Sequence, residues 1–530
     1  AAAVAKIVII LFTWSVMPRS WYVLDTIYLM ILIGATRVSY RLIRLRRQNR
    51  TFPWSKRKKV MIIGGGEAGR SLITEIQNSK YLDQKVVCII DDDPYKIGRY
   101  IKGVKVVGNR NSIKKSVKKY NVQQIILTIP SANAAKIRPI VEICQDTNCE
   151  LMILPGVYQL VNGEVKASKL RPVNIDDLLG RDEVHVNLNE VMDYVSGRVI
   201  MVTGGGGSIG SELCRQIAKH SPKQLIIFDI YENNAYDIQQ ELLREQPKLD
   251  LVVLIGSVRD ENRINSIFEQ YRPEIIYHAA AHKHVPLMEG SPNEAIKNNV
   301  LGTYNMVRMA DKWNAKRFVQ ISTDKAVNPT NIMGASKRIC EMIIQTYNKE
   351  SNTEYVAVRF GNVLGSNGSV IPLFKKQIAE GGPVTVTHPE IIRYFMTIPE
   401  AVSLVLQAGA YAKGGEIFVL DMGEPVKILD LARNMIRLSG YKVDQDIKIE
   451  FTGLRPGEKL YEELLMDEEG MTDTPNKLIH IGHPIDVDEV KLAHALRVLE
   501  SAAQNETDDM RLIVESIVPT YHPKLNKSTQ

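Results

Sequence analysis

Two glycine-rich segments constrain the fold of this chain more than any other feature. The segment at 64–69 (GGGEAG) follows an apolar run, and the segment at 203–210 (TGGGGSIG) follows another. Each leads into helical periodicity and then into a second apolar run that ends in aspartate, at 91–93 and at 229. Glycines in such a turn let a ligand approach the backbone, and the amino end of the next helix attracts phosphate. The chain is therefore predicted to contain two α/β units, each built on a parallel sheet.

The alternation of strands and helices divides the chain into a first domain over 57–180 and a second over 181–530. In the first, apolar runs at 124–128 and 150–154 continue the pattern. The predicted fold class is α/β, with two Rossmann-like doubly wound parallel-sheet domains preceded by N-terminal membrane helices. No catalytic side chains follow the first glycine turn, so it either binds a nucleotide or only joins a strand to a helix. Both interpretations stay open.

The N-terminal residues differ in composition from the rest. Apolar runs at 7–17 and 20–36 are each shorter than the roughly 20 residues of a spanning helix. Residues 37–59 then hold ten Lys and Arg and no Asp or Glu. A basic cluster beside apolar helices is typical of the cytoplasmic side of a membrane, so we expect residues 1–50 to form a membrane anchor. A buried helical hairpin with a solvated linker is the alternative. Because the chain opens on Ala inside an apolar run, we also expect a missing upstream part.

Composition excludes several classes of protein. The 530 residues are 45% apolar and 24% charged, which excludes bulk disorder. The net charge is +7, but outside residues 37–59 it is about −3, so a nucleic-acid partner is not expected. Five scattered cysteines are too few for a disulfide framework and are not spaced for zinc, so no metal site is predicted.

The second glycine turn has the fuller context of a dinucleotide site. Asp229 ends a strand 25 residues after Gly204, where a carboxylate binds both ribose hydroxyls and repels a 2′-phosphate, which favours NAD over NADP. Another strand ends in the small residues 279–281, which leave room for a flat cofactor. The predicted cofactor-binding residues are Gly204, Gly207, Ser208, Ile209, Gly210, Asp229, Ser257, Val258, Ala279, Ala280, Ala281, Asn299 and Lys337.

The catalytic candidates follow a later strand at 318–321. That strand ends in Thr323-Asp324-Lys325, and a helix then carries Met333-x-x-x-Lys337. By these residues the chain resembles the extended short-chain dehydrogenase/reductase superfamily. Within it, the chain is similar to the membrane-associated UDP-N-acetylglucosamine 4,6-dehydratases of bacterial polysaccharide and glycoprotein synthesis.

The resemblance covers most of the chain. Motifs at 359–365, 392–396 and 453–459 match the family as well. Met333 replaces the tyrosine of the superfamily's Tyr-x-x-x-Lys, which is itself a mark of the membrane-associated subgroup. Ser257 departs from the pattern, because relatives usually carry an aspartate there that contacts the adenine amine. This departure puts one cofactor contact in doubt but not the fold.

The resemblance implies a reaction and a role for each catalytic candidate. C4 of the sugar is oxidised, water is lost from C5 and C6, and hydride returns to C6. Thr323 would hold the C4 oxygen, and Asp324, with a pKa raised by burial, would protonate the leaving C6 hydroxyl. Lys325 would accept the C5 proton, and we expect its pKa to be lowered in the ternary complex. Lys337 would bind the nicotinamide ribose. Met333 cannot accept a proton, so the C4 hydroxyl would lose its proton to Thr323 or to a water relayed to Asp324.

Substrate binding is expected mainly from the C-terminal lobe. Arg393 and Arg455 suit a diphosphate because a guanidinium binds phosphate oxygens in pairs, although either arginine could instead form surface ion pairs. Asn362 would face the sugar or phosphate, Glu458 would bind a uridine ribose hydroxyl, and Lys283 completes the set.

The expected partners are UDP-N-acetylglucosamine as substrate, the bacterial inner membrane with the catalytic domain in the cytoplasm, and further copies of the chain in a homo-oligomer. Two alternatives stay open. One is a UDP-sugar 4-epimerase, for which Asp324-Lys325 would be superfluous. The other is a non-catalytic, membrane-anchored nucleotide-sugar sensor, with Met333 as a sign of lost catalysis.

Overall fold

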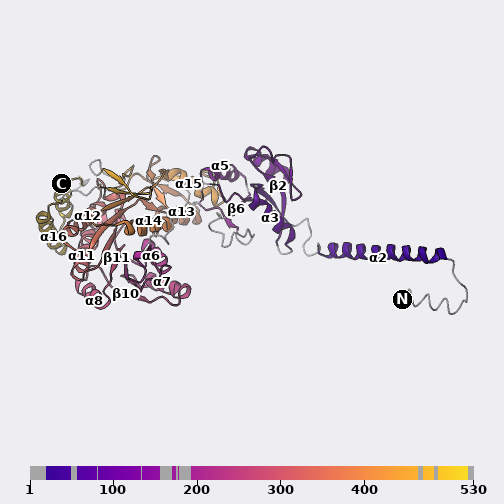
Figure 1. The fold of residues 1–530 in the computed structure, drawn as a ribbon. Helices are drawn as coiled ribbons and strands as arrows, with labels where there is room; N and C mark the ends of the chain where they lie inside the picture. The colour runs from indigo at the N-terminus through magenta and orange to yellow at the C-terminus, as the bar shows by residue number, and fades with distance from the viewer. Residues whose placement is uncertain are drawn as a thin grey trace. The chain divides into compact units, whose positions relative to one another are not determined.

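The chain divides into two compact units, Ala1–Ala132 with Glu142–Val173 and Asn133–Val141 with Asn174–Gln530 (Figure 1). Each unit is described by itself. The computed structural model describes residues 19–48, 57–79, 82–132, 134–147, 149–154, 170–174, 177, 192–463, 470–482 and 487–522.

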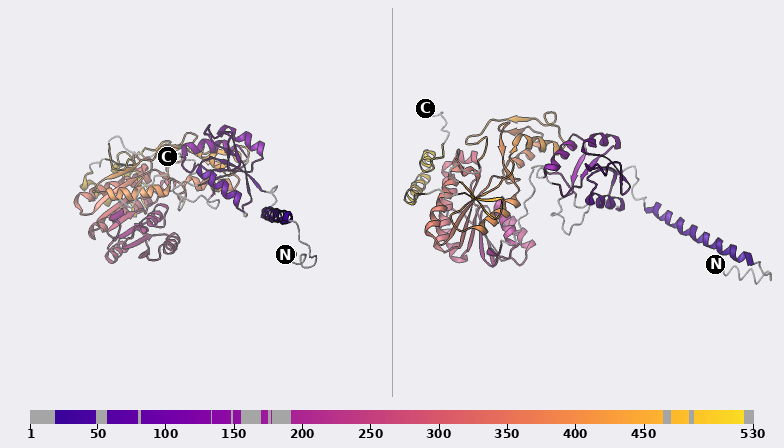
Figure 2. Two further views of the ribbon diagram at one scale, coloured as in Figure 1. Left: turned by 45° about the vertical axis from the view of Figure 1, so that its right-hand side comes forward. Right: turned by 45° about the horizontal axis from the view of Figure 1, so that its top comes forward.

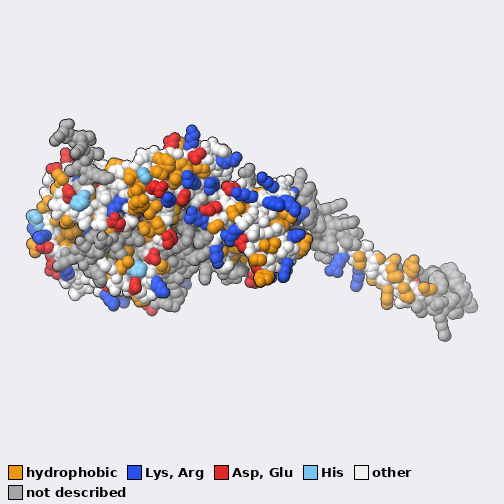
Figure 3. Space-filling view, turned by 90° about the horizontal axis from the view of Figure 1, so that it is seen from above, with side chains coloured by type: hydrophobic (Ala, Val, Ile, Leu, Met, Phe, Trp, Pro, Cys, Tyr) orange, Lys and Arg blue, Asp and Glu red, His pale blue; other side chains and the backbone are white. Residues whose placement is uncertain are grey.

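The first helix, α2 (Arg19–Gln48), is 30 residues long and contains the second apolar run. Its large apolar side chains between Leu24 and Tyr40 are exposed (Figure 3). The charged Asp25 interrupts the apolar run, and Arg37 follows it. Across the described parts of the chain, no helix is both long enough and apolar enough to cross a membrane. The predicted membrane-spanning helices therefore have no support there, and the run at 7–17 lies outside the described residues.

The first unit is built on a seven-stranded sheet in the order β3-β4-β2-β1-β5-β6-β7. All neighbouring strands are parallel except the edge strands β3 and β7, which run antiparallel to their partners. The last four residues of β1 are buried, as expected for a parallel strand covered on both faces. The elements are β1 (Lys58–Ile63), α3 (Glu67–Asn78), β2 (Gln84–Ile90), β3 (Tyr100–Ile101), β4 (Val104–Gly108), α4 (Ile113–Tyr120), β5 (Gln124–Leu127), β6 (Glu150–Ile153) and β7 (Arg171–Pro172). The helix α5 (Ala134–Gln145) is divided between the two units at Glu142.

Packing explains much of the glycine turn between β1 and α3. Gly64 has a φ of +105°, and a Cβ there would lie 2.8 Å from the carbonyl oxygen of Thr128. A Cβ on Gly69 would lie 2.1 Å from the Gly64 oxygen. The carboxylate of Asp91 accepts a backbone N–H of the turn at 2.7 Å and lies 3.1 Å from Lys96 Nζ. The fold of this unit therefore requires Gly64 and Gly69 without any ligand, and nucleotide binding by this turn stays a prediction.

The second unit is built on a nine-stranded sheet in the order β10-β9-β8-β11-β12-β13-β18-β22-β21. The strands from β10 to β18 are parallel, and β22 and β21 extend the sheet in antiparallel fashion. The strands of this sheet are β8 (Val199–Thr203), β9 (Gln224–Asp229), β10 (Leu251–Ile255), β11 (Ile275–His278), β12 (Arg317–Ile321), β13 (Glu354–Arg359), β18 (Ile417–Leu420), β21 (Met471–Asp473) and β22 (Ile479–Gly482).

Helices cover both faces of this sheet (Figure 2). Alternate residues of a strand point to opposite faces, so Met201 and Val202 of β8 belong to two different apolar clusters. One cluster contains side chains of α8 (Glu261–Tyr271), α11 (Gly302–Lys312), α12 (Ile332–Glu350), α16 (Glu489–Gln504) and α17 (Met510–Ile517). The other contains side chains of α6 (Ser208–Ala218), α7 (Glu232–Glu245) and α14 (Ile398–Tyr411).

Short strand pairs and connecting helices complete the second unit. The pairs are β14 with β17, β15 with β20, and β16 with β19. They belong to the C-terminal lobe that was predicted to bind substrate. The remaining elements are α9 (Val285–Gly290), α10 (Pro292–Ala295), the π-helical η9 (Ile296–Leu301), the 3-10 helix η10 (Asp324–Ala326), β14 (Asn362–Val363), α13 (Val370–Ala379), β15 (Val384–Val386), β16 (Ile392–Arg393), β17 (Phe395–Met396), β19 (Val426–Lys427), α15 (Ile428–Leu438) and β20 (Ile449–Phe451).

Candidate active site

The loops that follow β8 and β11 meet at the carboxyl edge of the nine-stranded sheet. The chain order changes direction at this point, because β9 lies on one side of β8 and β11 lies on the other, and such positions bind ligands in α/β sheets. Gly204 has a φ of +65°, and a Cβ there would lie 2.8 Å from the backbone nitrogen of Ala280. The two loops can therefore approach this closely only with glycine at position 204.

A cleft of about 210 Å³ opens over these strand ends. Eight predicted cofactor-binding residues line it together: Gly204, Gly207, Asp229, Ser257, Val258, Ala279, Ala280 and Ala281. Asn234, His282 and Asn298 also line the cleft and were not predicted. His282 directly follows the predicted residues 279–281 and Asn298 directly precedes Asn299, so their place in the sequence could have indicated them, whereas Asn234 belongs to no predicted segment.

Asp229, at the end of β9, is nearly buried and fixes the glycine turn. Its carboxylate accepts the backbone N–H groups of Gly206 and Tyr231, both at 2.8 Å. Because a carboxylate has about four acceptor positions, it can still take ribose hydroxyls from the cleft. The hydroxyl of Ser257 accepts the backbone N–H of Arg259 at 3.2 Å, and it stands where the resemblance predicts a carboxylate.

Three residues predicted to bind cofactor lie in the first turn of α6. A Cβ on Gly210 would lie 2.1 Å from the Gly204 oxygen, so this glycine allows α6 to pack on the turn. The Ser208 hydroxyl accepts the backbone N–H of Asn367 at 3.2 Å, and Ile209 packs against the apolar cluster under α6. Their contribution to cofactor binding stays a prediction.

Asn299 supports the loop after β11. Its side-chain oxygen accepts the backbone N–H of His282 at 2.8 Å, and its amide nitrogen donates to the His282 carbonyl and to the Ser336 hydroxyl, each at 3.0 Å. The structure thus gives Asn299 a positioning role beside the cleft. The neighbouring Asn298 is the residue that lines it.

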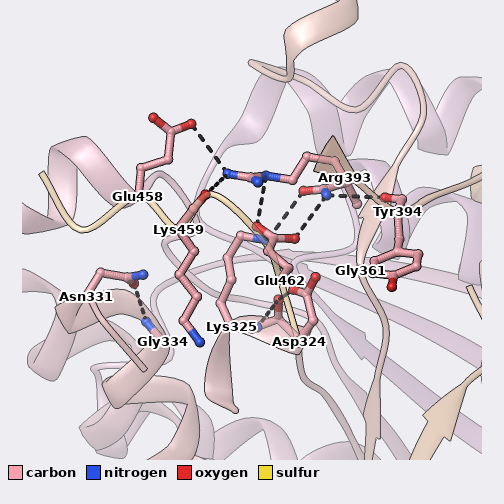
Figure 4. Close-up of polar contacts among 12 residues, drawn as sticks. Asp324, Lys325, Asn331, Gly334, Gly361, Arg393, Tyr394, Glu458, Lys459 and Glu462 are labelled. Atoms are coloured by element: carbon pink, nitrogen blue, oxygen red, sulfur yellow. Dashed lines mark hydrogen bonds and ion pairs between the residues drawn. The ribbon is translucent and has the colours of Figure 1, made fainter. Parts of the chain in front are cut away.

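The three adjacent catalytic candidates lie after the end of β12 and at the start of η10, and their side chains are bonded to one another. Figure 4 shows Asp324 beside Lys325. The Thr323 hydroxyl donates to Asp324 Oδ1 at 2.8 Å, and Lys325 Nζ donates to the same oxygen at 3.1 Å. Asp324 is only 2% exposed. Lys325 Nζ also lies 3.0 Å from Glu462 Oε1 and 3.4 Å from Asn362 Oδ1.

Burial raises the pKa of Asp324 to about 7, Lys325 opposes this effect, and the negative Glu462 adds to it. A raised pKa from burial was predicted, and the structure confirms it. Asp324 can therefore hold a proton near neutral pH, which an acid for a leaving hydroxyl must do.

The pKa of Lys325 shifts opposite to the direction predicted for the ternary complex. Burial lowers it, but the carboxylates of Asp324 and Glu462 outweigh burial, so in this arrangement the pKa is raised. Asp324 raises this pKa most, and Glu462 adds a second negative charge that the sequence analysis did not include. The sequence did not single out Glu462, because it lies beyond the motif at 453–459 in a run of acids typical of a solvated surface.

Met333 and Lys337 lie on α12 directly behind the tripeptide. A Cβ on Gly334 would lie 2.1 Å from the Lys325 carbonyl oxygen, so the first turn of α12 packs against η10. Met333 is buried in an apolar cluster and has no proton to exchange. Lys337 is also buried, and burial lowers its pKa.

The prediction that Arg393 binds a diphosphate is not supported by its contacts. Its guanidinium is buried, with Nε 3.1 Å from Glu462 and Nη2 3.5 Å from Glu458. The terminal nitrogens donate to three carbonyl oxygens, those of Ile392 at 2.7 Å, Leu460 at 3.3 Å and Lys459 at 2.8 Å. A guanidinium has five N–H donors, and these contacts engage both terminal nitrogens and Nε. Arg393 therefore holds the 458–462 segment in place.

A second cavity, of about 220 Å³, brings the catalytic and substrate candidates together. Asp324 and Lys325 line it, and so do all five predicted substrate residues: Lys283, Asn362, Arg393, Arg455 and Glu458. Lys459 and Glu462 line it as well and were not predicted. Arg455 is exposed on the wall of the cavity, and its backbone N–H donates to Glu458 at 3.1 Å. Arg455 and Lys283 therefore have the positive charge that suits an anionic substrate.

The chain is similar to several known proteins. The model of the polysaccharide biosynthesis protein family matches residues 200–484, and that of a CoA-binding domain matches residues 1–155. The capsular polysaccharide biosynthesis protein CapD of Staphylococcus aureus is 49% identical over 83% of this chain and 73% of its own length. A protein of Rickettsia bellii named UDP-glucose 4-epimerase is 36% identical over 51% of this chain and 79% of its own length. The X-ray structure of Pen from Bacillus thuringiensis is 34% identical with a TM-score of 0.51, covering 56% of this chain and 90% of that one.

The fold and the site define an extended short-chain dehydrogenase/reductase. The family match spans more than half of the chain. The chain belongs to the bacterial polysaccharide biosynthesis protein family.

Proposed function

We propose that the protein is an NAD-dependent dehydratase that converts UDP-N-acetylglucosamine into the UDP-4-keto-6-deoxy sugar for polysaccharide synthesis. One observation carries the proposal. Asp324, a buried carboxyl with a raised pKa, is bonded to Lys325 in a cavity that is also lined by basic side chains. Loss of water across C5 and C6 needs an acid and a base side by side, whereas inversion at C4 needs no acid at C6.

The cleft after β8 fits NAD. Gly204 and Gly207 line the cleft without side chains, which lets a pyrophosphate approach the backbone, and Asp229 presents a carboxylate for the ribose hydroxyls and against a 2′-phosphate. Ala279 and Ala280 present a flat wall of small side chains. When bound there, NAD would accept a hydride from C4 of the sugar and return it to C6. The proton of the C4 hydroxyl would pass through Thr323, or through a water, to Asp324, and Lys325 would give a proton back to C5 when the hydride reaches C6.

The residues of the chain carry out the loss of water. The Thr323 hydroxyl holds the C4 oxygen of the substrate. Protonated Asp324 gives its proton to the C6 oxygen as the C6–O bond breaks and water leaves. Lys325 takes the C5 proton as the electrons of the C5–H bond form the double bond to C6. The C5 proton can be removed because C4 is a ketone at this stage.

Lys325 must lose a proton before it can act as the base. In the ligand-free arrangement its pKa is raised, so it is an ammonium ion. A bound sugar would remove water from the cavity and disfavour that charge, because burial lowers the pKa of a lysine. We therefore expect proton release when the substrate binds.

The C-terminal lobe would bind the nucleotide part of the substrate. Arg455 is exposed on the cavity wall, and its guanidinium can bind two oxygens of a diphosphate at once. Lys283 adds positive charge to the same wall. Glu458 can accept a hydrogen bond from a ribose hydroxyl.

A 4-epimerase is the second candidate, because the related Rickettsia bellii protein carries that name. The test is to incubate the purified full chain with NAD and UDP-N-acetylglucosamine, with UDP-glucose in parallel, and to separate the products for mass spectrometry. A product lighter by one water supports the dehydratase. A product of unchanged mass but different retention would establish the epimerase, and unchanged substrate would overturn both.

We also propose that the protein works at the cytoplasmic face of the bacterial membrane. This rests on the exposed apolar side chains of α2 and on the ten Lys and Arg at 37–59. Figure 3 shows further Lys and Arg over the first unit. Flotation with anionic and neutral vesicles tests this. We expect the full chain to float with anionic vesicles and salt to weaken this binding. The proposal is overturned if the floated fraction contains as much protein without vesicles as with them.

A further inference from the structure

Glu462 belongs to the catalytic cluster although the reaction as proposed gives it no step. It lies after β20 in the C-terminal lobe, and its side chain is 4% exposed. Its Oε1 lies 3.0 Å from Lys325 Nζ and 3.1 Å from Arg393 Nε, and its Oε2 accepts the Asn362 amide at 3.3 Å. Figure 4 shows the Glu462 carboxylate between the lysine and the arginine.

Arg393 also holds the backbone next to Glu462. Arg393 donates to the carbonyl oxygens of Lys459 and Leu460 while its Nε contacts the Glu462 carboxylate. One guanidinium thus holds both the segment and the acid that the segment carries. The buried contact with Arg393 therefore keeps the carboxylate of Glu462 next to Lys325.

Four charged groups meet in this buried cluster: Asp324 and Lys325 from η10, Arg393 from β16, and Glu462. The other titratable or charged residues that line the same cavity are Lys283, His284, Arg455, Glu458, Lys459 and Glu463. Burial opposes ionisation of Glu462, but Lys325 and Arg393 outweigh it, so its pKa is lowered while that of Asp324 is raised. Of the two acids, Asp324 is therefore the one that holds a proton.

We propose that Glu462 is a positioning residue of the dehydration, which holds the lysine base against the acid and, by its negative charge, keeps the exchangeable proton on Asp324. The inference rests on the proposed function. Glu462 itself neither gains nor loses a proton. Asp324 gives the proton that leaves with water, and Lys325 receives the proton from C5.

The test is Glu462→Gln in the full chain, with the pH profile of kcat as the main readout. Removing one negative charge lowers the pKa of Asp324 and of Lys325. The two limbs of the pH profile, which report these two groups, therefore both move to lower pH. We expect the pH optimum to move to lower pH and kcat to fall roughly 10- to 100-fold near neutral pH. If kcat falls equally at every pH and the optimum stays in place, the contact is only structural and the proposal is overturned.

Two matched variants support the measurement. Glu462→Asp keeps the charge, so its pH optimum is expected to stay close to that of the wild type even if the shorter side chain lowers kcat. Glu390→Gln removes an exposed carboxylate, paired with Lys427 at 2.8 Å in the same lobe, and is expected to leave the optimum unchanged. An equal shift in all three variants would overturn the proposal.

A second readout does not depend on turnover. Acetic anhydride reacts only with a neutral amine, so the pH dependence of Lys325 acetylation, followed by mass spectrometry of its peptide, reports the pKa of that lysine. We expect half-maximal labelling at lower pH in Glu462→Gln than in the wild type. An unmoved labelling profile would overturn the role of Glu462. Absence of dehydration by the wild type would instead overturn the proposed function, so the two failures are distinguishable.

Discussion

Asp324 combines two properties that oppose each other in most carboxyl groups. It is buried at the end of a strand, and it is still bonded to an ammonium group at 3.1 Å. Burial favours the neutral acid and the lysine favours the anion. The balance leaves the pKa at about 7, so the side chain can carry a proton and release it under the conditions of the reaction.

Asp324→Asn is expected to abolish the loss of water while keeping the site in place. An asparagine oxygen can still accept the bonds from Thr323 and Lys325, but the amide has no proton to give to the C6 oxygen. We expect kcat for the product lighter by one water to fall roughly 10²- to 10⁴-fold, measured by mass spectrometry. Asp237→Asn, on the exposed face of α7, is the matched control. Unchanged turnover by Asp324→Asn would rule out the dehydratase.

The same substitution changes the pH dependence of stability. The pKa of Asp324 is raised from 3.8 to about 7 in the folded chain, so the folded protein holds a proton that the unfolded chain has released. This contribution to stability is fully present below pH 3.8 and is lost as the pH rises through about 7. We expect the wild type to lose stability relative to Asp324→Asn over that window, measured as the difference in Tm. A constant difference would contradict the raised pKa.

Asp229 is expected to decide between the two nicotinamide cofactors. Asp229→Ser removes the charge that repels a 2′-phosphate, so the preference for NAD over NADP should fall roughly 10- to 100-fold, measured as the ratio of kcat/KM values. Asp260→Asn is the control, because this carboxylate caps α8 by accepting the Arg263 N–H at 3.0 Å and does not line the cleft. A preference that is the same in Asp229→Ser and wild type would show that other residues select the cofactor.

At the scale of helices and strands, the sequence predicted those parts of the site that are defined by residues close together in the chain. The turn after β8, the carboxylate that ends β9 and the small residues after β11 lie at fixed spacings along the chain, and the structure brings them to one cleft. The role of Arg393 and the presence of Glu462 could not be predicted in this way. Both depend on the C-terminal lobe folding against the end of β12. No spacing between neighbouring residues in the sequence indicates this contact.

The support under the catalytic loop is a buried ion pair between α12 and β13. Glu341 and Arg359 are both 0% exposed and lie 2.7 Å apart, and Glu341 also accepts the hydroxyl of Ser322, the residue before the tripeptide. Glu341→Gln leaves the Arg359 charge without its carboxylate, so we expect a loss of about 3–5 kcal/mol in the free energy of unfolding. Urea denaturation measures it, and a loss below about 1 kcal/mol would show that water or another group compensates.

At the scale of the whole molecule, the chain has separate apolar cores. Val60, Ile62 and Leu72 belong to the core of the first unit, and the second unit has clusters on the two faces of its own sheet. The cofactor cleft and the substrate cavity are both lined by residues of the second unit. Ligands bound there would therefore stabilise the second unit directly.

Calorimetry of the full chain is therefore expected to show two unfolding transitions, of which NAD and UDP move only one. At a ligand concentration 100 times the Kd, the bound unit gains about 2.7 kcal/mol, which raises the Tm of its transition by several degrees. Asp229→Ser should reduce the shift caused by NAD but not the shift caused by UDP, because Asp229 lines the cofactor cleft and is absent from the lining of the substrate cavity. A single transition that moves as a whole would show that the two units unfold together, and a shift of both transitions would mean that the first unit also binds one of these ligands.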